Sequence, residues 1–249
     1  MSAKSLRGKD NRNLLGATNF NPADFPLGSP ESRAAARAVL LEEEANDAIW
    51  KACLQKGATF DSGCLLWLTQ HTATEDQHWM SKGTQPIAPF PKKQYFAVVL
   101  YYLLNRPKVF IPKTREMMTS WLVCGYVAWQ MQWFPGMVWV LQSQKEDKAA
   151  DLVNYIRMLY RLQDPWMKER VKVVADNYTE LKLSNGSKVT GIPQGADQWR
   201  SHHPHGVVFD EASHLTEAEA CYNIAAPVAR QIIGISSVAP GFFANQCGL

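Results

Sequence analysis

Two adjacent carboxylates and one basic, hydroxyl-rich segment are the residues whose spacing suggests chemistry. Asp210 and Glu211 end the apolar run Gly-Val-Val-Phe-Asp-Glu-Ala of residues 206–212. Neighbouring residues of a strand point to opposite faces of a sheet, so the two carboxylates can do different work. One can position Mg²⁺ on a phosphate group, and the other can orient or deprotonate a water molecule. A strand that simply ends at a solvated Asp-Glu pair is the alternative.

The basic segment is Lys-Thr-Arg-Glu-Met-Met-Thr-Ser, residues 113–120, and it follows the apolar run 108–112. A strand, a loop and a helix N-terminus in this order can bind phosphate, because free backbone N–H groups and the helix dipole attract an anion. Ser120 stands where a hydroxyl ligand of Mg²⁺ would lie, and Lys113 and Arg115 add positive charge. The segment lacks both glycines of the G-x-x-x-x-G-K-[ST] pattern and the lysine before the serine. An ordinary loop is therefore the alternative.

The elements that must position these residues alternate along the chain after residue 91. Short apolar runs alternate with segments of helical period, which predicts a mostly parallel sheet covered by helices on both faces. The predicted strands are residues 108–112, 137–143, 206–212 and 230–237, and the predicted helices are residues 92–105, 117–134 and 146–163. Residues 179–193 predict a hairpin, because Asn185-Gly186 offers two turn residues that tolerate positive φ.

The N-terminal third has a different composition. Residues 1–30 are rich in Asn, Pro, Gly and Ser, which predicts a flexible arm. Residues 29–57 predict a helix with an Ala/Leu-rich body, and the mixed segment that follows ends in a Pro-rich linker. We therefore expect a helical N-terminal segment over residues 31–88, able to act as a lid, and a core domain over residues 89–249.

Bulk composition limits the class of protein. The chain has 249 residues, 46% hydrophobic and 20% charged, which fits a globular domain. Its net charge of +3 permits a nucleic-acid partner without requiring one. The five scattered cysteines predict reduced thiols. The most apolar stretch, residues 117–141, contains polar residues and is broken by Pro135-Gly136, so we expect no membrane span.

The order of these motifs resembles the large subunit of phage terminase, the motor that packages DNA into viral heads, over residues 63–241. The resemblance implies an ASCE-type P-loop NTPase core with a mostly parallel sheet flanked by helices. It also implies that the variant phosphate loop contacts nucleotide, that Ser120 and Asp210 hold Mg²⁺, and that Glu211 is the catalytic carboxylate. The implied loop contacts are Lys113, Thr114, Arg115, Thr119 and Ser120.

Three further segments resemble motifs of the same family. Arg200 lies ten residues before Asp210, where the resemblance implies an arginine finger that reaches a neighbouring subunit's ATP. Arg157 and Arg161 are the alternatives for that role. Ser236 and Ser237 resemble the coupling motif that senses the γ-phosphate. Gln94 and Tyr95 lie in a segment that resembles the adenine contact.

The implied activity is ATP hydrolysis that drives double-stranded viral DNA into a procapsid, in the host cell cytoplasm. The implied partners are a homo-oligomeric ring of the same chain, DNA held by its backbone without sequence preference, the portal protein and the small terminase subunit. The family's C-terminal nuclease has no counterpart before Leu249, which we interpret as truncation rather than a naturally split motor. A helicase-like DExx translocase and a non-catalytic nucleic-acid-binding scaffold are the alternatives.

Overall fold

The computed structural model describes residues 30–75, 86–199 and 202–248 of the chain. Contacts between Cα atoms divide the chain into residues 1–53 and residues 54–249. The described part of the first unit is helical and belongs to α3 (Pro30–Leu54), whose last turn carries Lys51. A basic side chain there complements the negative end of the helix dipole. The predicted helix at residues 29–57 is confirmed over this range.

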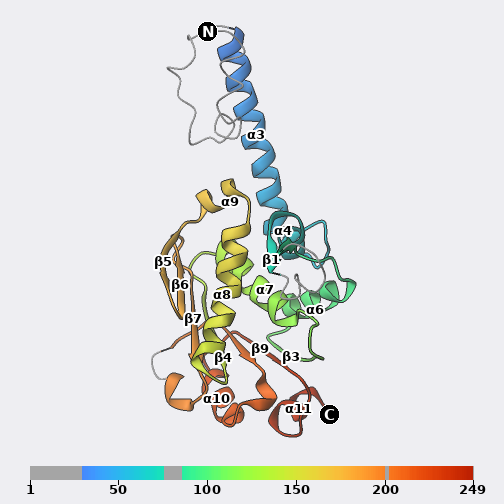
Figure 1. The fold of residues 1–249 in the computed structure, drawn as a ribbon, viewed down its shortest axis with the longest axis vertical. Helices are drawn as coiled ribbons and strands as arrows, with labels where there is room; N and C mark the ends of the chain where they lie inside the picture. The colour runs from blue at the N-terminus through green and yellow to red at the C-terminus, as the bar shows by residue number, and fades with distance from the viewer. Residues whose placement is uncertain (1–29, 76–85, 200–201, 249) are drawn as a thin grey trace. The chain divides into compact units, whose positions relative to one another are not determined.

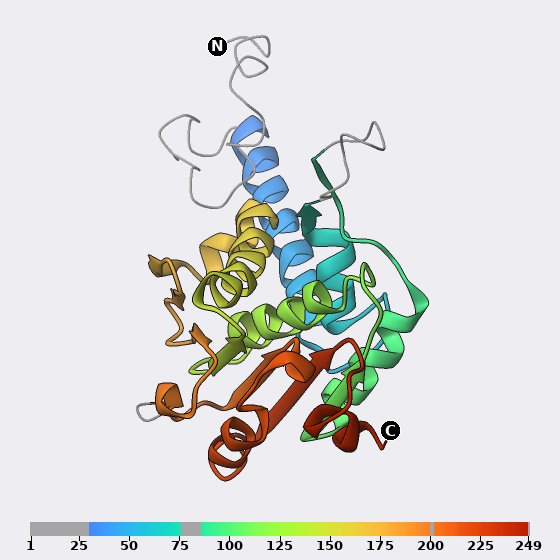
Figure 2. The same cartoon turned by 60° about the horizontal axis from the view of Figure 1, so that its bottom comes forward.

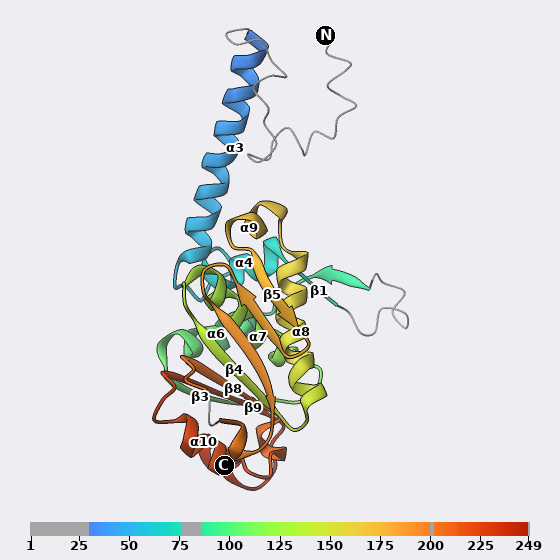
Figure 3. The same cartoon turned by 90° about the vertical axis from the view of Figure 1, so that its left-hand side faces the viewer.

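A sheet of seven strands forms the centre of the second unit (Figure 3). The strand order is β3-β9-β8-β4-β7-β6-β5; the first five strands are parallel, and β7, β6 and β5 pair antiparallel. The bounds are β3 Lys108–Pro112, β4 Val138–Ser143, β5 Val173–Asn177, β6 Glu180–Leu183, β7 Lys188–Pro193, β8 Gly206–Asp210 and β9 Gln231–Ser236. The mostly parallel sheet is confirmed, and β5 is a strand that the sequence pattern did not predict.

The position of β9 determines the topology of the parallel part. β9 is the last strand in the chain, yet it lies between two earlier strands: it pairs with β3 on one side and with β8 on the other. The additional strand between β3 and β8 is the feature that distinguishes the ASCE arrangement of the P-loop fold, so the predicted fold class is confirmed. Because all three strands are parallel, the loops that follow them leave from the same edge of the sheet.

Helices cover both faces of the parallel strands (Figures 1 and 2). α7 and α8 lie on one face, and α10, α11 and a core cluster around Phe209 and Trp199 lie on the other. The helices of this unit are α4 Gly63–His71, α6 Gln94–Asn105, α7 Thr119–Trp133, α8 Glu146–Leu162, α9 Pro165–Arg170, α10 Ala218–Ala225 and α11 Phe242–Cys247. Within the described ranges, no helix has both the length and the apolar character that crossing a membrane requires.

Two helices show how the sequence pattern leads to packing. α8 buries Ala149, Leu152, Ile156 and Leu159, the stripe expected from helical periodicity. α7 is buried on nearly all sides, because α8, α4 and the sheet surround it. Its apolar sequence therefore reflects a central position in the core.

The hairpin of residues 179–193 forms, but its turn differs from the prediction. Gly186 has a φ of +85°, whereas Asn185 does not have a positive φ. The amide of Gly186 donates to the Leu183 carbonyl, as in a turn followed by a left-handed glycine. The Asn185 side chain donates to the Met131 carbonyl at 2.8 Å and accepts the Ser187 amide hydrogen at 3.1 Å. Tertiary hydrogen bonding thus determines the conformation of Asn185.

Residues 54–75 and 86–88 belong to the same compact unit as the sheet, whereas the prediction assigned them to the N-terminal segment. α4 packs on α7, and β1 (Ala73–Glu75) packs on α8. β1 pairs antiparallel with β2 (Ile87–Pro89), where the sequence predicted only a rigid linker. The lid function expected of residues 31–88 stays a prediction.

The contact between α8 and β7 can be tested at Gly191. A Cβ atom there would lie 2.7 Å from the Ala149 carbonyl oxygen, which is backbone and cannot rotate away. We expect Gly191→Ala to lower the free energy of unfolding by about 1–3 kcal/mol, the usual cost of overpacking a core. Urea unfolding measures it, with Lys188→Ala on the same strand as control. Equal stability of Gly191→Ala and wild type would contradict the close approach.

Candidate active site

The loops after β3, β8 and β9 meet at the carboxyl edge of the sheet. Pro112 at the end of β3 pairs with Ser236 at the end of β9, and Ile235 pairs with Asp210 at the end of β8. The amide of Lys113 donates to the Ser236 carbonyl at 2.9 Å, which extends the β3–β9 ladder by one residue. Open parallel sheets bind ligands at this edge.

The two carboxylates of the pair point to different partners. Asp210 accepts a hydrogen bond from the Ser120 hydroxyl at 2.9 Å, so it faces α7. Glu211 has a left-handed backbone, with a φ of +49°, and forms a 2.9 Å ion pair with the Lys113 ammonium. Ser236 donates to the other Glu211 oxygen at 3.4 Å. The segment after β3 therefore contacts both carboxylates, through Lys113 and through Ser120.

Burial gives Asp210 an unusual protonation equilibrium. Desolvation raises the pKa of the Asp210 carboxyl; the Ser120 hydrogen bond opposes the rise, the nearby Glu211 charge adds to it, and Lys113 opposes it. Burial also raises the pKa of the Cys124 thiol well above its usual value, and the Asp210 charge adds to that rise. An ionised Asp210 is thus poorly solvated, and a cation bound at its oxygens would offset this cost.

The loop between β3 and α7 has a glycine-like backbone without glycine. Glu116 and Met118 have φ values of +63° and +53°. When Ser120 is aligned with the last residue of the G-x-x-x-x-G-K-[ST] pattern, Met118 takes the place of the second glycine. Such a conformation costs a non-glycine residue roughly 1–2 kcal/mol. The Tyr95 hydroxyl donates to the Met117 carbonyl and so supports the loop from α6.

A cavity of about 460 Å³ opens beside this loop. Trp121 and Tyr155 line it as a stacked pair, with ring centroids 4.2 Å apart and planes inclined by 19°. β1, β2 and Lys93 form further parts of the wall, and Met118, Thr119 and Ser120 form the side next to the carboxylates. A flat aromatic wall joined to a polar end can accommodate a planar base attached to phosphates.

Comparisons with known proteins address the fold. No protein-family model and no curated protein matches the chain. Three solved structures are similar. The bacteriophage HK97 large terminase is 11% identical, with a TM-score of 0.52, over 70% of this chain and 36% of that chain. The chain has a large-terminase fold.

The other two structures are of the Thermus phage P74-26 large terminase ATPase domain. One is 15% identical, with a TM-score of 0.48, over 70% of this chain and 73% of that chain. The other, a point mutant, is 13% identical, with a TM-score of 0.49, over 70% of this chain and 74% of that chain. The likeness to the HK97 protein establishes the terminase fold alone, because its sequence identity is low.

Within the terminase fold, half of the predicted site residues converge. Hydrogen bonds or ion pairs connect Lys113, Ser120, Asp210, Glu211 and Ser236, as described above. Thr119 is buried and lines the cavity.

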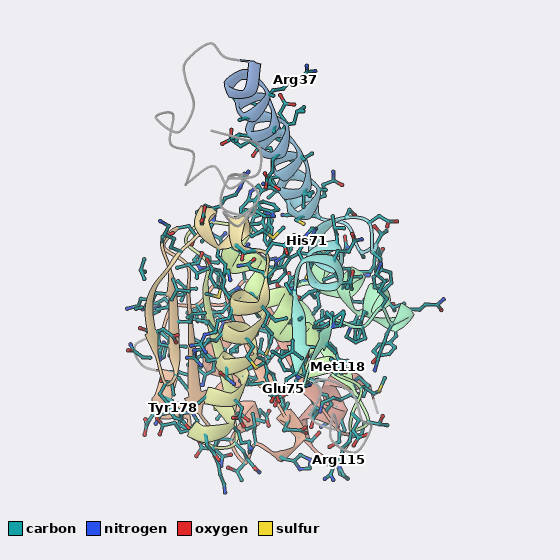
Figure 4. The ribbon with its side chains drawn as sticks, turned by 45° about the horizontal axis from the view of Figure 1, so that its top comes forward. Arg37, His71, Glu75, Arg115, Met118 and Tyr178 are labelled. Atoms are coloured by element: carbon teal, nitrogen blue, oxygen red, sulfur yellow. The ribbon has the colours of Figure 1, made fainter. Side chains whose placement is uncertain are left out.

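Other predicted residues lie apart from the cavity. Thr114 and Arg115 are exposed on the loop (Figure 4 labels Arg115) and do not line the cavity. Gln94 is exposed in the first turn of α6, and Tyr95 contacts the loop rather than the cavity. Ser237 bonds to His214 at 3.1 Å.

The arginine-finger prediction falls partly outside the description of the structure. Arg200 lies outside the described residues. Of its alternatives, Arg157 is engaged in a structural contact: its guanidinium donates to Asp176 at 2.6 Å and to the Asn177 carbonyl at 2.7 Å. Arg161 also reaches Asp176, at 3.4 Å, and is 66% exposed.

The oxygens at the polar end fit a magnesium ion that also binds phosphate. Mg²⁺ prefers oxygen ligands and usually takes one or two from the protein, with waters and phosphates completing its shell. The Ser120 hydroxyl and the Asp210 carboxylate, 2.9 Å apart, supply such a pair. No group of three or more His, Cys, Asp or Glu that could hold a metal occurs among the residues described, so a site built by protein side chains alone is not found there.

The raised pKa of Asp210 predicts how stability changes with pH. The folded state holds this proton more tightly than the unfolded state, so ionised Asp210 destabilises the fold above the raised pKa. We expect Asp210→Asn to be more stable than wild type at pH 7 without magnesium or nucleotide. The difference should shrink as the pH falls from the raised pKa toward the ordinary aspartate pKa, and it should vanish below the ordinary pKa, where both states are protonated.

Urea unfolding at pH 7 and at acidic pH checks this expectation. Asp61→Asn, at an exposed position in the same compact unit, is the matched control. A lower stability of Asp210→Asn at pH 7 would mean that the fold favours the charged carboxylate.

Proposed function

We propose that this protein hydrolyses ATP to drive double-stranded viral DNA into a procapsid, as the motor domain of a terminase large subunit. The observation that carries the proposal is the convergence at one sheet edge of Lys113, Ser120, Asp210 and Glu211, next to a 460 Å³ cavity with an aromatic wall. The terminase fold supports it. The Ser236 contact to Glu211 adds a route from the site into the sheet.

The carboxylates and the serine would divide the chemistry. Ser120 and Asp210 would hold Mg²⁺, which supplies positive charge to the phosphate oxygens when bound. Glu211 would accept the proton of the attacking water. Its partner Lys113 is a strong candidate for the phosphate contact, because phosphate oxygens would compete with the carboxylate for the same ammonium.

The nucleotide would lie along the cavity. Its phosphates would meet Thr119 at the N-terminus of α7, where N–H groups and the helix dipole favour an anion. Thr114 and Arg115, which lie outside the cavity, would reach the phosphates from the exposed loop. Its base would lie near Trp121 and Tyr155, with Gln94 and Tyr95 as the contacts that the sequence predicts. Coupling to movement would pass through Ser236 and Ser237.

The larger assembly follows from the same proposal. The chain would form a homo-oligomeric ring in which Arg200 of one subunit reaches the ATP of the next. DNA would be gripped through its backbone, and the portal protein and the small terminase subunit would be partners in the host cell cytoplasm. The lid function expected of residues 31–88 belongs to the same proposal, and the arm expected at residues 1–30 lies, except for Pro30, outside the described residues.

One observation favours a second candidate, a non-catalytic nucleic-acid-binding scaffold. Thr119 stands where the standard phosphate-loop pattern has its lysine, so the loop's positive charge must come from Lys113, seven residues before Ser120. If Lys113 only neutralises Glu211, the loop would have no lysine for the ATP phosphates. The domain would then act as a nucleic-acid-binding scaffold without ATP turnover.

Replacing the proposed base separates the two candidates. We expect Glu211→Gln to lower ATP turnover by at least about 100-fold, the lower range for general base catalysis, while nucleotide binding persists. Steady-state phosphate release on the assembled protein measures turnover. Glu219→Gln, an exposed glutamate in the first turn of α10, is the control and should retain full activity. Turnover retained in Glu211→Gln would exclude Glu211 as the base, and no turnover in any assembled wild-type protein would favour the scaffold.

The trans arginine predicts concentration-dependent activity. We expect turnover per subunit to rise with protein concentration, and Arg200→Ala to lower the plateau by about 10³-fold or more, the range for arginine fingers. Arg161→Ala tests the exposed alternative for the finger, and because Arg161 forms a surface ion pair with Asp176, we expect its loss to leave the plateau unchanged. Concentration-independent turnover that Arg200→Ala leaves unchanged would contradict the trans role.

A further inference from the structure

A second cavity, of about 320 Å³, lies at the amino edge of the sheet, opposite the candidate active site. Its lining residues Arg106, Met137, His205 and Arg230 come just before the starts of β3, β4, β8 and β9. Strands of five or six residues separate the two edges, which is about 17–20 Å at 3.3 Å per residue. The cavity is therefore distinct from the nucleotide site.

The backbone holds His205 in one orientation. Its ring Nδ1 accepts the amide hydrogen of Val138 at 3.1 Å, and its own amide donates to the Val138 carbonyl at 2.8 Å. The His205 carbonyl accepts the amides of Arg230 and Gln231 at 2.9 and 3.1 Å. Since Nδ1 is an acceptor here, the ring proton is on Nε2, which is a donor.

A second fixed donor lines the same cavity. Trp139 is 1% exposed, and its indole Nε1 is buried without a hydrogen-bond partner. Its ring packs against Gly206, where an added Cβ would come within 2.3 Å of the indole, so it has no room to shift. A buried N–H without an acceptor is costly, so this ring adds a local polar environment to the cavity wall.

The charged groups of the lining are all basic. Arg106 and Arg230 are exposed, and within the described part of the chain neither guanidinium forms an ion pair or a side-chain hydrogen bond. No Asp or Glu lines the cavity. Gln231 is already used, since its side chain donates to the Leu103 carbonyl and accepts the Tyr126 hydroxyl. Apart from the Asn105 side-chain oxygen, the side-chain groups left for a ligand are the guanidiniums and the His205 ring N–H, all donors, which suits an oxyanion.

We propose that this cavity binds a phosphate-class oxyanion, and that in the working protein this is a phosphodiester of the DNA backbone. This rests on the proposed function, which supplies the DNA. An extended polyanion fits better than a free ion, because both arginines are exposed. The exposed Lys108, two residues after Arg106, adds a third positive charge, although its ammonium donates to the Tyr222 hydroxyl at 2.7 Å. One phosphate oxygen would meet the His205 ring N–H, and the arginines would hold that phosphate and its neighbour.

Salt dependence of DNA binding tests the proposal. Each phosphate contact contributes about 0.9 to the slope of log K against log salt, so Arg106→Ala with Arg230→Ala should lower the slope by about 1.8. Binding of a short duplex is measured without nucleotide. The control is Lys168→Ala with Lys172→Ala, which removes the same charge from the region around α9. A slope that falls only in the cavity variant supports the proposal; one that falls only in the control, or in neither, overturns it.

Inorganic phosphate distinguishes the source of the oxyanion. Within the described residues the side chains of the two arginines form no hydrogen bond or ion pair, and alanine keeps their backbone hydrogen bonds, so the double variant should unfold at the wild-type temperature. Phosphate should raise the unfolding temperature of wild type more than that of the variant. If phosphate stabilises only wild type while DNA binding is equal in both, the nucleic-acid source is overturned.

The nucleotide site is followed separately with a fluorescent ATP analogue, whose affinity the cavity variant should leave unchanged. A lower slope in the cavity variant, together with no ATP turnover in any assembled wild-type protein, would support this cavity and refute the proposed motor function. Loss of both nucleotide and DNA binding in the variant would overturn the cavity's independence.

Discussion

The candidate active site depends on the hydrogen bonds of Ser236, at the end of β9. Ser236 is fully buried, and its backbone carbonyl accepts the Lys113 amide at 2.9 Å. Its hydroxyl accepts the Ser213 amide at 3.1 Å and donates to Glu211 at 3.4 Å. Because β9 lies between β3 and β8, this one residue fixes the loop that follows each neighbouring strand.

The same arrangement explains how two strained loops persist. Met118 and Glu211 are non-glycine residues in the left-handed region, one on each side of the site. Such positions persist only where the surroundings determine them. The Tyr95 hydroxyl holds the loop just before Met118. Glu211 is held by its ion pair with Lys113 and by the hydrogen bond from the Ser236 hydroxyl. Contacts from outside the loop thus take over the role that glycine has in the standard phosphate-binding pattern.

The polar end of the site could be predicted from sequence, because it depends on local patterns. An apolar run that ends in Asp210-Glu211, and another that ends before Lys113, place both at the carboxyl edge of any parallel sheet. The cavity wall could not be predicted in this way. Trp121 and Tyr155 lie on different helices, and each has the apolar spacing of an ordinary core residue. Their stacking depends on how α7 and α8 cross, which no single segment specifies.

Gln94 is a second case in which the local sequence does not determine where a side chain points. Its segment was expected to contact adenine, but the start of α6 turns the side chain to solvent and uses Tyr95 to support the loop. Local sequence predicted the helix; the orientation of its first turn depends on packing of Phe96 in the core. The N-terminal segment is similar, since β1 and β2 join the core through a long-range pairing that neither short strand indicates alone.

Strands β8 and β9 extend from one edge of the sheet to the other, and both begin at the basic cavity. His205 precedes β8 and Glu211 follows it; Arg230 precedes β9 and Ser236 ends it. Under the proposed function, a DNA phosphate would bind where these two strands begin, and ATP would bind where they end. Buried strands are stiff, so coupling between the edges requires a contact with two alternative arrangements. The 3.4 Å hydrogen bond from Ser236 to Glu211 is the longest in the network around Ser236, whereas its backbone bond to Lys113 is 2.9 Å. A change at Glu211 would therefore break this hydrogen bond first, while the backbone pairing of β9 with β3 stays in register.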